Sequence, residues 1–167
     1  PGVSRGLVYG VAGTATGSEF IGWASAVEFS FKEQAARGAL HKIAADFRTG
    51  GPVQTGRTIL TYSAPGATGP TNNMDGGAAS TGCAFYLAGN ASAGAANVRV
   101  QHSASAGTAS FANVATFSAI ASGVFFERLT TTGNVFRYTR ADITTASGVG
   151  AIAALNLFVG IVRGLTS

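Results

Sequence analysis

Glycine interrupts this chain every few residues, and this spacing leaves little room for long helices. Glycine in a helix interior costs about 0.5–1 kcal/mol relative to alanine, and 24 of the 167 residues are glycine. Apolar runs of strand length lie between the breaks. The runs cover residues 7–11, 20–31, 40–47, 58–62, 83–87, 98–102, 111–117, 124–129, 135–140 and 151–162. Many short strands with frequent turns predict an all-β fold, a two-sheet, jelly-roll-like β-sandwich.

One segment departs from this pattern. Residues 32–46, KEQAARGALHKIAAD, hold the best helix formers of the chain, with Gly38 among them. We expect a short helix or an irregular turn near residues 33–37 and then a strand. The alternative is one helix over residues 33–45. As a strand, the second part places His41, Ile43, Ala45 and Phe47 on one face.

A single domain over residues 1–167 is expected, because neither half has enough strands to close a core alone. The clearest long loop covers residues 64–77, where PGATGPTNNMDGG carries two prolines, two asparagines and an Asp-Gly pair. This loop is either a plain surface loop or an arm that reaches a neighbouring subunit.

Charge is scarce. Only 11% of the residues are charged, whereas about 25% is usual for soluble domains. A monomer with so few charges exposes a large weakly polar surface, which other subunits would cover. The low charge therefore predicts a component of an assembly rather than a free monomeric enzyme.

The net charge of +4 is spread along the chain without a basic run or stripe. This distribution argues against sequence-specific DNA binding and leaves, at most, sequence-independent contact with DNA. Residues 143–162 are uncharged, but so are 76–98 and 100–126. A buried strand explains such a stretch better than a membrane span, so no membrane contact is expected. Cys83 is the only cysteine and is predicted to be a small buried residue.

No arrangement of residues in the sequence indicates a catalytic site. The seven acids form no carboxylate pair, and neither His41 nor His102 has metal-ligand spacing. We therefore predict no enzymatic activity, no catalytic or metal-binding residues and no cofactor, and the sequence identifies no binding residue. His102 alternates with Val98 and Val100, so we expect it to face the interior with a hydrogen bond.

Aromatic residues gather near both ends of the chain. In sandwiches such residues are normally core, and the alternative is a sugar-binding row. The early group is Phe20, Trp23, Phe29 and Phe31, and the late group is Phe125, Phe126, Phe136, Tyr138 and Phe158.

The final run, residues 151–162, is apolar on both faces. Such a strand at a free edge would be an aggregation hazard. We therefore expect it to be central in its sheet or covered by a neighbouring subunit.

Several short patterns in the second half resemble structural proteins of tailed bacteriophages. They are MDGGAASTGCAFYLAG, NVRVQHSASAGTASFANVATFSAI, FERLTTTGNVFRYTRADITT and AALNLFVGIVRG. The matching positions are 75–82, 98–103, Phe111, Phe117, 134–140 and 155–163, and the resemblance covers about half of the chain. The pattern looks most like the C-terminal half of phage tail proteins, often tail tube proteins.

This resemblance implies a virion protein, made in the bacterial host cytoplasm, that assembles with copies of itself and with other virion proteins. A closed homo-oligomeric ring is expected, with a hexamer as the first expectation. A DNA conduit avoids a strongly basic lumen, so the arginines should point outward or be paired. A capsid-associated or head–tail junction protein is the alternative within the same class.

The same half also resembles galactose-binding-like sandwiches, in which a Gln-x-Ser hairpin precedes an Arg-Tyr-x-Arg strand. Here Ala-Gly occupies positions 106–107, where those proteins carry Asp-Gly. This resemblance implies a carbohydrate- or receptor-binding module as a second alternative.

Overall fold

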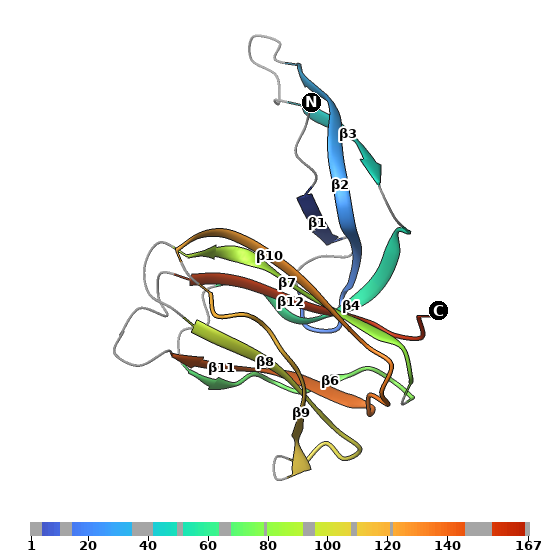
Figure 1. Ribbon diagram of the computed structural model, residues 1–167, viewed down its shortest axis with the longest axis vertical. Helices are drawn as coiled ribbons and strands as arrows, with labels where there is room; N and C mark the ends of the chain where they lie inside the picture. Colours follow the sequence, from blue (N-terminus) through green and yellow to red (C-terminus); the bar gives the residue numbers. More distant parts are fainter. Residues whose placement is uncertain are drawn as a thin grey trace.

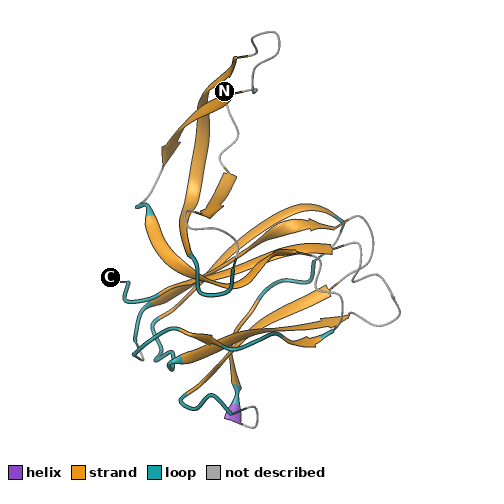
Figure 2. Cartoon of the chain, turned by 180° about the vertical axis from the view of Figure 1, so that it is seen from behind, coloured by secondary structure: helices purple, strands orange, loops and turns teal. Residues whose placement is uncertain are grey.

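The computed structural model describes residues 5–10, 15–34, 42–49, 52–63, 68–78, 80–91, 96–107, 110–120, 122–145 and 155–165. Over these residues the fold is all β, apart from a single 3₁₀ position at Ser110 (Figure 2). The strands are β1 (Arg5–Gly10), β2 (Glu19–Gln34), β3 (Lys42–Thr49), β4 (Gln54–Ser63), β5 (Gly69–Pro70), β6 (Met74–Asp75), β7 (Cys83–Ala91), β8 (Ala96–Ser103), β9 (Ala112–Thr116), β10 (Gly123–Thr131), β11 (Tyr138–Thr145) and β12 (Leu155–Val162).

The strands form two antiparallel sheets that pack face to face (Figure 1). Sheet A has the order β1-β2-β4-β12-β7-β10, with β3 also paired to β2. Sheet B has the order β5-β11-β8-β9, with β6 also paired to β11. The predicted two-sheet sandwich is confirmed.

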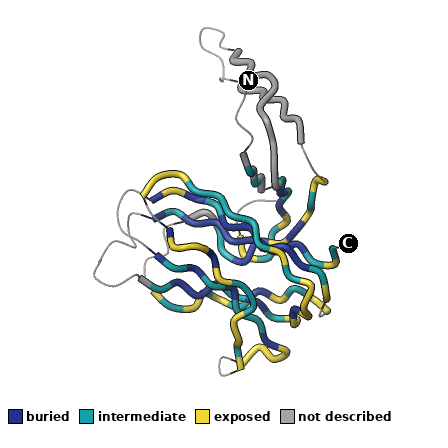
Figure 3. Tube along the Cα trace, in the orientation of Figure 1, coloured by how far each residue is buried: buried dark blue, intermediate teal, exposed yellow. Residues whose placement is uncertain are grey.

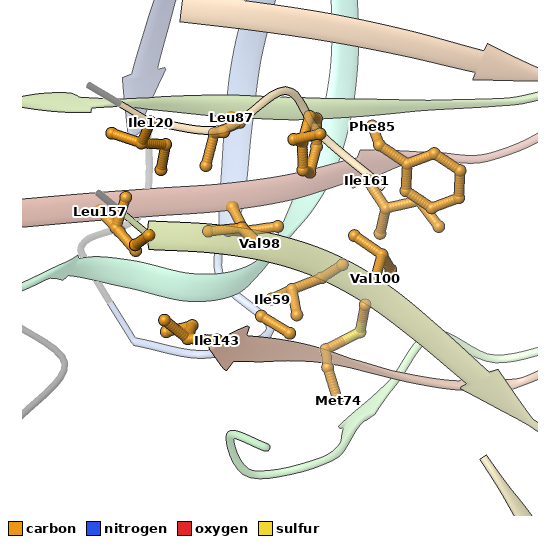
Figure 4. Packing of buried hydrophobic residues seen from close by; sticks show 14 of the residues in the cluster. Ile59, Met74, Phe85, Leu87, Val98, Val100, Ile120, Ile143, Leu157 and Ile161 are labelled. Atoms are coloured by element: carbon orange, nitrogen blue, oxygen red, sulfur yellow. The ribbon is translucent and has the colours of Figure 1, made fainter. Parts of the chain in front are cut away.

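The main core lies between the sheets (Figure 4). Strand β7 supplies Phe85 and Leu87 from sheet A, and β8 supplies Val98 and Val100 from sheet B, all at most 1% exposed. The alternation expected for residues 98–102 is therefore confirmed at Val98 and Val100, whereas His102 is only partly buried. Met74 of β6 is also in this core.

Strand β12 is central in sheet A, between β4 and β7. Its residues alternate between two clusters, as the apolar pattern on both faces predicted. Leu155, Leu157, Val159 and Ile161 join the main core. Phe158 and Val162 join a second cluster on the outer face of sheet A. Residues 151–154 lie outside the described residues.

The second cluster exists because sheet A curls, so that its first strand returns toward its last. Gly6 of β1 lies so close to β10 that a Cβ atom there would be 1.9 Å from the Phe126 ring. Inside this curl are Phe20, Ala84, Tyr86, Phe158 and Val162.

Three details correct the sequence analysis. A helix over residues 33–45 is wrong at both ends, because Glu33 and Gln34 belong to β2 and residues 42–45 belong to β3. Cross-strand pairing overrides their helix propensity. Residues 35–41, and His41 with them, lie outside the described residues. The expected strand after this segment is confirmed as β3.

The second correction concerns the run at residues 135–140. The strand there is β11, Tyr138–Thr145, and Val135 forms only an isolated bridge with Ser80. One inward position of β11 is Thr139, whose polar side chain is fully buried. Because this position is not apolar, the apolar pattern did not reveal where the strand begins and ends.

The third concerns the predicted loop at 64–77. Its described part lies along the chain's own sheet B, because β5 and β6 both pair with β11. Thr71 also donates its backbone N–H to the Ala141 carbonyl.

Candidate assembly interface

The most distinctive feature of the molecule is an arm of two strands that stands away from the sandwich (Figures 1 and 2). We call β3 and the outer half of β2, residues 26–34, the arm. The two strands pair from Ala26 opposite Thr49 to Gln34 opposite Lys42, with one register shift between Glu28 and Ser30.

The register shows how the arm grows out of sheet A. Ala26 pairs with β1 on one side and with β3 on the other, and Gly22 pairs with β1 and with β4 in the same way. Strands β3 and β4 therefore lie on the same side of β2. Together they form one long return strand, interrupted at residues 50–53.

The arm has no second layer among the described residues. Strand β1 pairs with β2 only as far as Ala26, and β4 pairs with β2 only at residues 19–22. An isolated two-stranded hairpin is marginally stable in water and needs further strands or a packing partner. The arm is therefore the part of the structure that most requires a partner.

The arm is anchored at its base by aromatic rings. Phe20 is fully buried and meets Tyr86 and Phe158 edge to face, with ring centroids 5.6 and 5.2 Å away. Two glycines leave room for the Phe20 ring, since a Cβ at Gly56 or Gly160 would lie 2.5 Å from it.

Three polar side chains, which we call the clamp, are hydrogen-bonded to one another at the base of the arm. The Tyr86 hydroxyl donates to Gln54 Oε1 at the start of β4. Arg128 of β10 donates from Nε to the Tyr86 hydroxyl at 3.2 Å and from Nη2 to Gln54 Oε1 at 3.2 Å. The three side chains join β4, β7 and β10 around the foot of the arm.

A pocket of about 210 Å³ opens beside this foot. Its lining holds one carboxylate, from Glu19, and the guanidinium groups of Arg57 and Arg163. Glu19 stands opposite Arg57 across the β2–β4 ladder. Among the described residues, the other side chains of its lining are those of Thr55 and Ile161.

Arg163 ties three distant segments together at this end of the sandwich. Its Nη1 donates to the Val135 carbonyl at 3.0 Å, and its Nη2 donates to the carbonyls of Phe136 and Arg137 at 2.8 and 3.2 Å. Gly76 allows the approach, because a Cβ there would lie 2.6 Å from Arg163 Nε. Burial lowers the pKa of Arg163, although the group keeps its charge at neutral pH.

Asp75 and Arg137 form a bidentate ion pair beside Arg163, with contacts of 2.9 and 2.7 Å. The hydrogen bonds from Arg137 and from the Gly77 backbone lower the pKa of Asp75 to about 2. The hydrogen bond to Asp75 raises the pKa of Arg137. Three of the patterns that carry the phage resemblance, at 75–82, 134–140 and 155–163, thus meet here in structural contacts.

The other sequence-predicted groups are dispersed. His102 accepts a hydrogen bond at Nδ1 from the Phe136 N–H at 3.2 Å, which confirms its expected hydrogen bond, and burial lowers its pKa. Glu127 accepts from the Ser118 N–H at 2.8 Å. Cys83 is buried, as expected. Asp46 lies in β3.

Sequence reasoning missed a polar network on the outer face of sheet B. Asp142, only 7% exposed, pairs with Arg99 and accepts from Gln101. Arg140 donates to Gln101 at 2.8 Å and lies over the Phe111 ring, 4.1 Å from its centroid. The signal was the alternation of polar residues with Val98 and Val100, but partners on separate strands are not visible in sequence.

The late aromatic residues fall into different surroundings. Phe158 belongs to the second cluster, Phe126 is partly buried against it, and Phe125 is partly buried against the main core. Phe136 is 39% exposed and stacks on His102, with ring centroids 4.7 Å apart. In the early group Phe20 is buried and Trp23 is partly buried, and the side chains of Phe29 and Phe31 lie outside the described ones. The expected core position is thus confirmed for Phe20 and Phe158, and Phe136 is an exception.

No group of three or more histidine, cysteine or acidic residues in the described part of the chain is placed to hold a metal ion. Within the same residues, no helix has the length and apolar character needed to cross a membrane.

Comparison with protein-family models and with curated proteins finds no match to this chain. The resemblance to phage tail proteins therefore stays a prediction from sequence patterns.

Proposed function

We propose that this protein is a structural virion protein of a tailed bacteriophage, a tail tube-like subunit that assembles with copies of itself. The observation that carries the proposal is the arm: a two-stranded ribbon that leaves the sandwich and has no partner among the described residues. A neighbouring copy supplies the missing partner in the proposed assembly.

The sequence of the arm supports this role. Its strands carry Val27, Phe29 and Phe31 in β2 and Ile43 and Phe47 in β3. Burying apolar surface stabilises an interface by about 25 cal/mol per Å². The apolar residues of this ribbon would gain from burial against a second copy.

The pairing of two arginines is compatible with a place beside DNA in a virion, because a carboxylate partner neutralises positive charge that would otherwise hold phosphate. Arg99 pairs with Asp142, and Arg137 pairs with Asp75. Arg128, Arg140 and Arg163 donate to neutral side chains or carbonyls and keep their positive charge. In the proposed tube these three should face away from the DNA.

The test is electron microscopy and mass photometry of the purified full chain. We expect closed rings or stacked tubes. The double substitution Phe29→Asp and Phe31→Asp places charge on the arm and should give monomers with a cooperatively folded sandwich. Phe136→Asp, exposed and on the sandwich rather than the arm, is the matched control and should still assemble. A wild-type protein that stays monomeric overturns the proposal.

A further inference from the structure

We propose that the arm of one copy pairs, strand to strand, with the free edge of β10 in a second copy. This inference rests on the proposed self-assembly and specifies the two surfaces that meet. Exposed strand edges are the places where another strand can add to a sheet.

Most edges in the described part of the chain are blunted. Strand β9 has five residues and a register shift against β8. Strands β5 and β6 have two residues each. Strand β1 has a register irregularity between Arg5 and Leu7. Short and bulged edges are the devices by which proteins prevent edge-to-edge pairing.

Strand β10 lacks these devices. It is nine residues long and pairs with β7 from Gly123 to Thr131 without a register shift. Among the described strands only β7 pairs with it, so its outward N–H and C=O groups have no ladder partner in that part of the chain. Gly6 of β1 lies close to the Phe126 ring of β10 but forms no ladder with this strand. Val124, at its start, is 84% exposed. Figure 3 shows β10 in intermediate and exposed colours where β7 beside it is largely buried.

The charged side chains of β10 do not protect this edge from pairing with another strand. Edge strands are commonly protected by charged side chains. Here Glu127 accepts hydrogen bonds from Ser118, and Arg128 closes the clamp on Tyr86 and Gln54. Both charges are thus engaged within their own subunit.

The arm matches this edge in length. Strand β3 has eight residues, which span about 26 Å at roughly 3.3 Å per residue. Strand β10 has nine. Within the described part of the chain the arm does not pair with its own β10, whose only paired strand is β7. The arm also points away from the sandwich (Figure 1).

Arm-to-edge pairing uses two different surfaces, so each copy gives an arm and receives one. Such a head-to-tail contact closes into a ring when the rotation between copies divides a full turn, and otherwise produces a filament. The contact therefore leads to the kind of assembly that the proposed function requires.

The test is cysteine cross-linking between two variants mixed before assembly. One carries Ala44→Cys or Ala45→Cys in the arm; these adjacent positions sample both faces of β3. The other carries Val124→Cys or Thr130→Cys in β10. A short bismaleimide is added, and the products are mapped by mass spectrometry. Wild-type protein, whose Cys83 is buried, is the control and should not cross-link.

We expect arm-to-β10 products in the mixtures and few products from either variant alone. Oligomers that yield arm-to-arm or β10-to-β10 products overturn this inference but leave the proposed self-assembly intact. Absence of any oligomer overturns both, and mass photometry of the same samples identifies that outcome.

Discussion

Phe20, at the base of β2, meets Tyr86 of β7 edge to face, with ring centroids 5.6 Å apart. The contact joins the strand that forms the arm to a central strand of the sandwich. The Tyr86 hydroxyl continues the connection by donating to Gln54, where β4 begins. The direction of the arm thus depends on a small cluster at its foot.

Phe20→Ala should destabilise the protein by about 3–5 kcal/mol, because it removes a fully buried ring and leaves a cavity. The measurement is urea unfolding followed by tryptophan fluorescence and circular dichroism. Val53→Ala is the control: Val53 is 54% exposed, beside the same foot, and its truncation should change stability by less than about 0.5 kcal/mol. Equal costs for the two variants would contradict the proposed anchor.

Gly56→Ala should also destabilise the fold. A Cβ at this position would lie 2.4 Å from the Ile161 carbonyl oxygen and 2.5 Å from the Phe20 ring. Overpacking of this kind costs about 1–3 kcal/mol. Gly107→Ala is the matched control, since its nearest neighbour would be 3.7 Å away. Thermal unfolding of both variants decides the point, and a normal melting temperature for Gly56→Ala would count against the close packing.

Asp75 should make stability depend on pH in strong acid. Its pKa is lowered from 3.8 to about 2, so its contribution is present above pH 3.8 and is lost as the pH falls toward 2. The difference in melting temperature between wild type and Asp75→Asn should shrink over this interval. Arg137→Gln should behave in the same way, because it removes the other half of the ion pair. A constant difference across the interval would contradict the assignment.

His102 should make the stability of the fold depend on pH closer to neutrality than Asp75 does. Burial, together with the charge of Arg163, lowers its pKa below 6.5. The folded protein therefore prefers the neutral ring, and its stabilising effect is present above pH 6.5 and is lost as the pH falls through the lowered pKa. Protonation also removes the acceptor for the Phe136 N–H. Melting temperatures of wild type and His102→Gln between pH 7.5 and 5 test this: only the wild type should show this loss.

The fold was largely readable from sequence, because the period-2 pattern and the glycine breaks are local signals. The pattern of Leu157 and Phe158, on opposite faces of one strand, predicted a strand that is central in its sheet or covered by a neighbouring subunit, and β12 is central. Met74 was less visible, since a lone apolar residue in a polar loop does not reveal that it enters the core.

The arm and the contacts of Arg163 could not be predicted from the sequence. Residues 20–31 were expected to form an ordinary strand, but no local pattern indicates that β2 extends beyond β1 and β4, the strands that pair with its base. The same holds for Arg163, whose partners at 135–137 come from a segment far away in the sequence. Contacts of this kind depend on topology, which a single sequence encodes only through its long-range pairing.

The most direct test of self-assembly through the arm is electron microscopy of the wild-type protein beside the Phe29→Asp, Phe31→Asp variant at equal concentration. We predict closed rings or tubes for the wild type and single 16.7 kDa subunits for the variant. Wild-type protein that is monomeric, or a variant that assembles as the wild type does, would contradict the central claim.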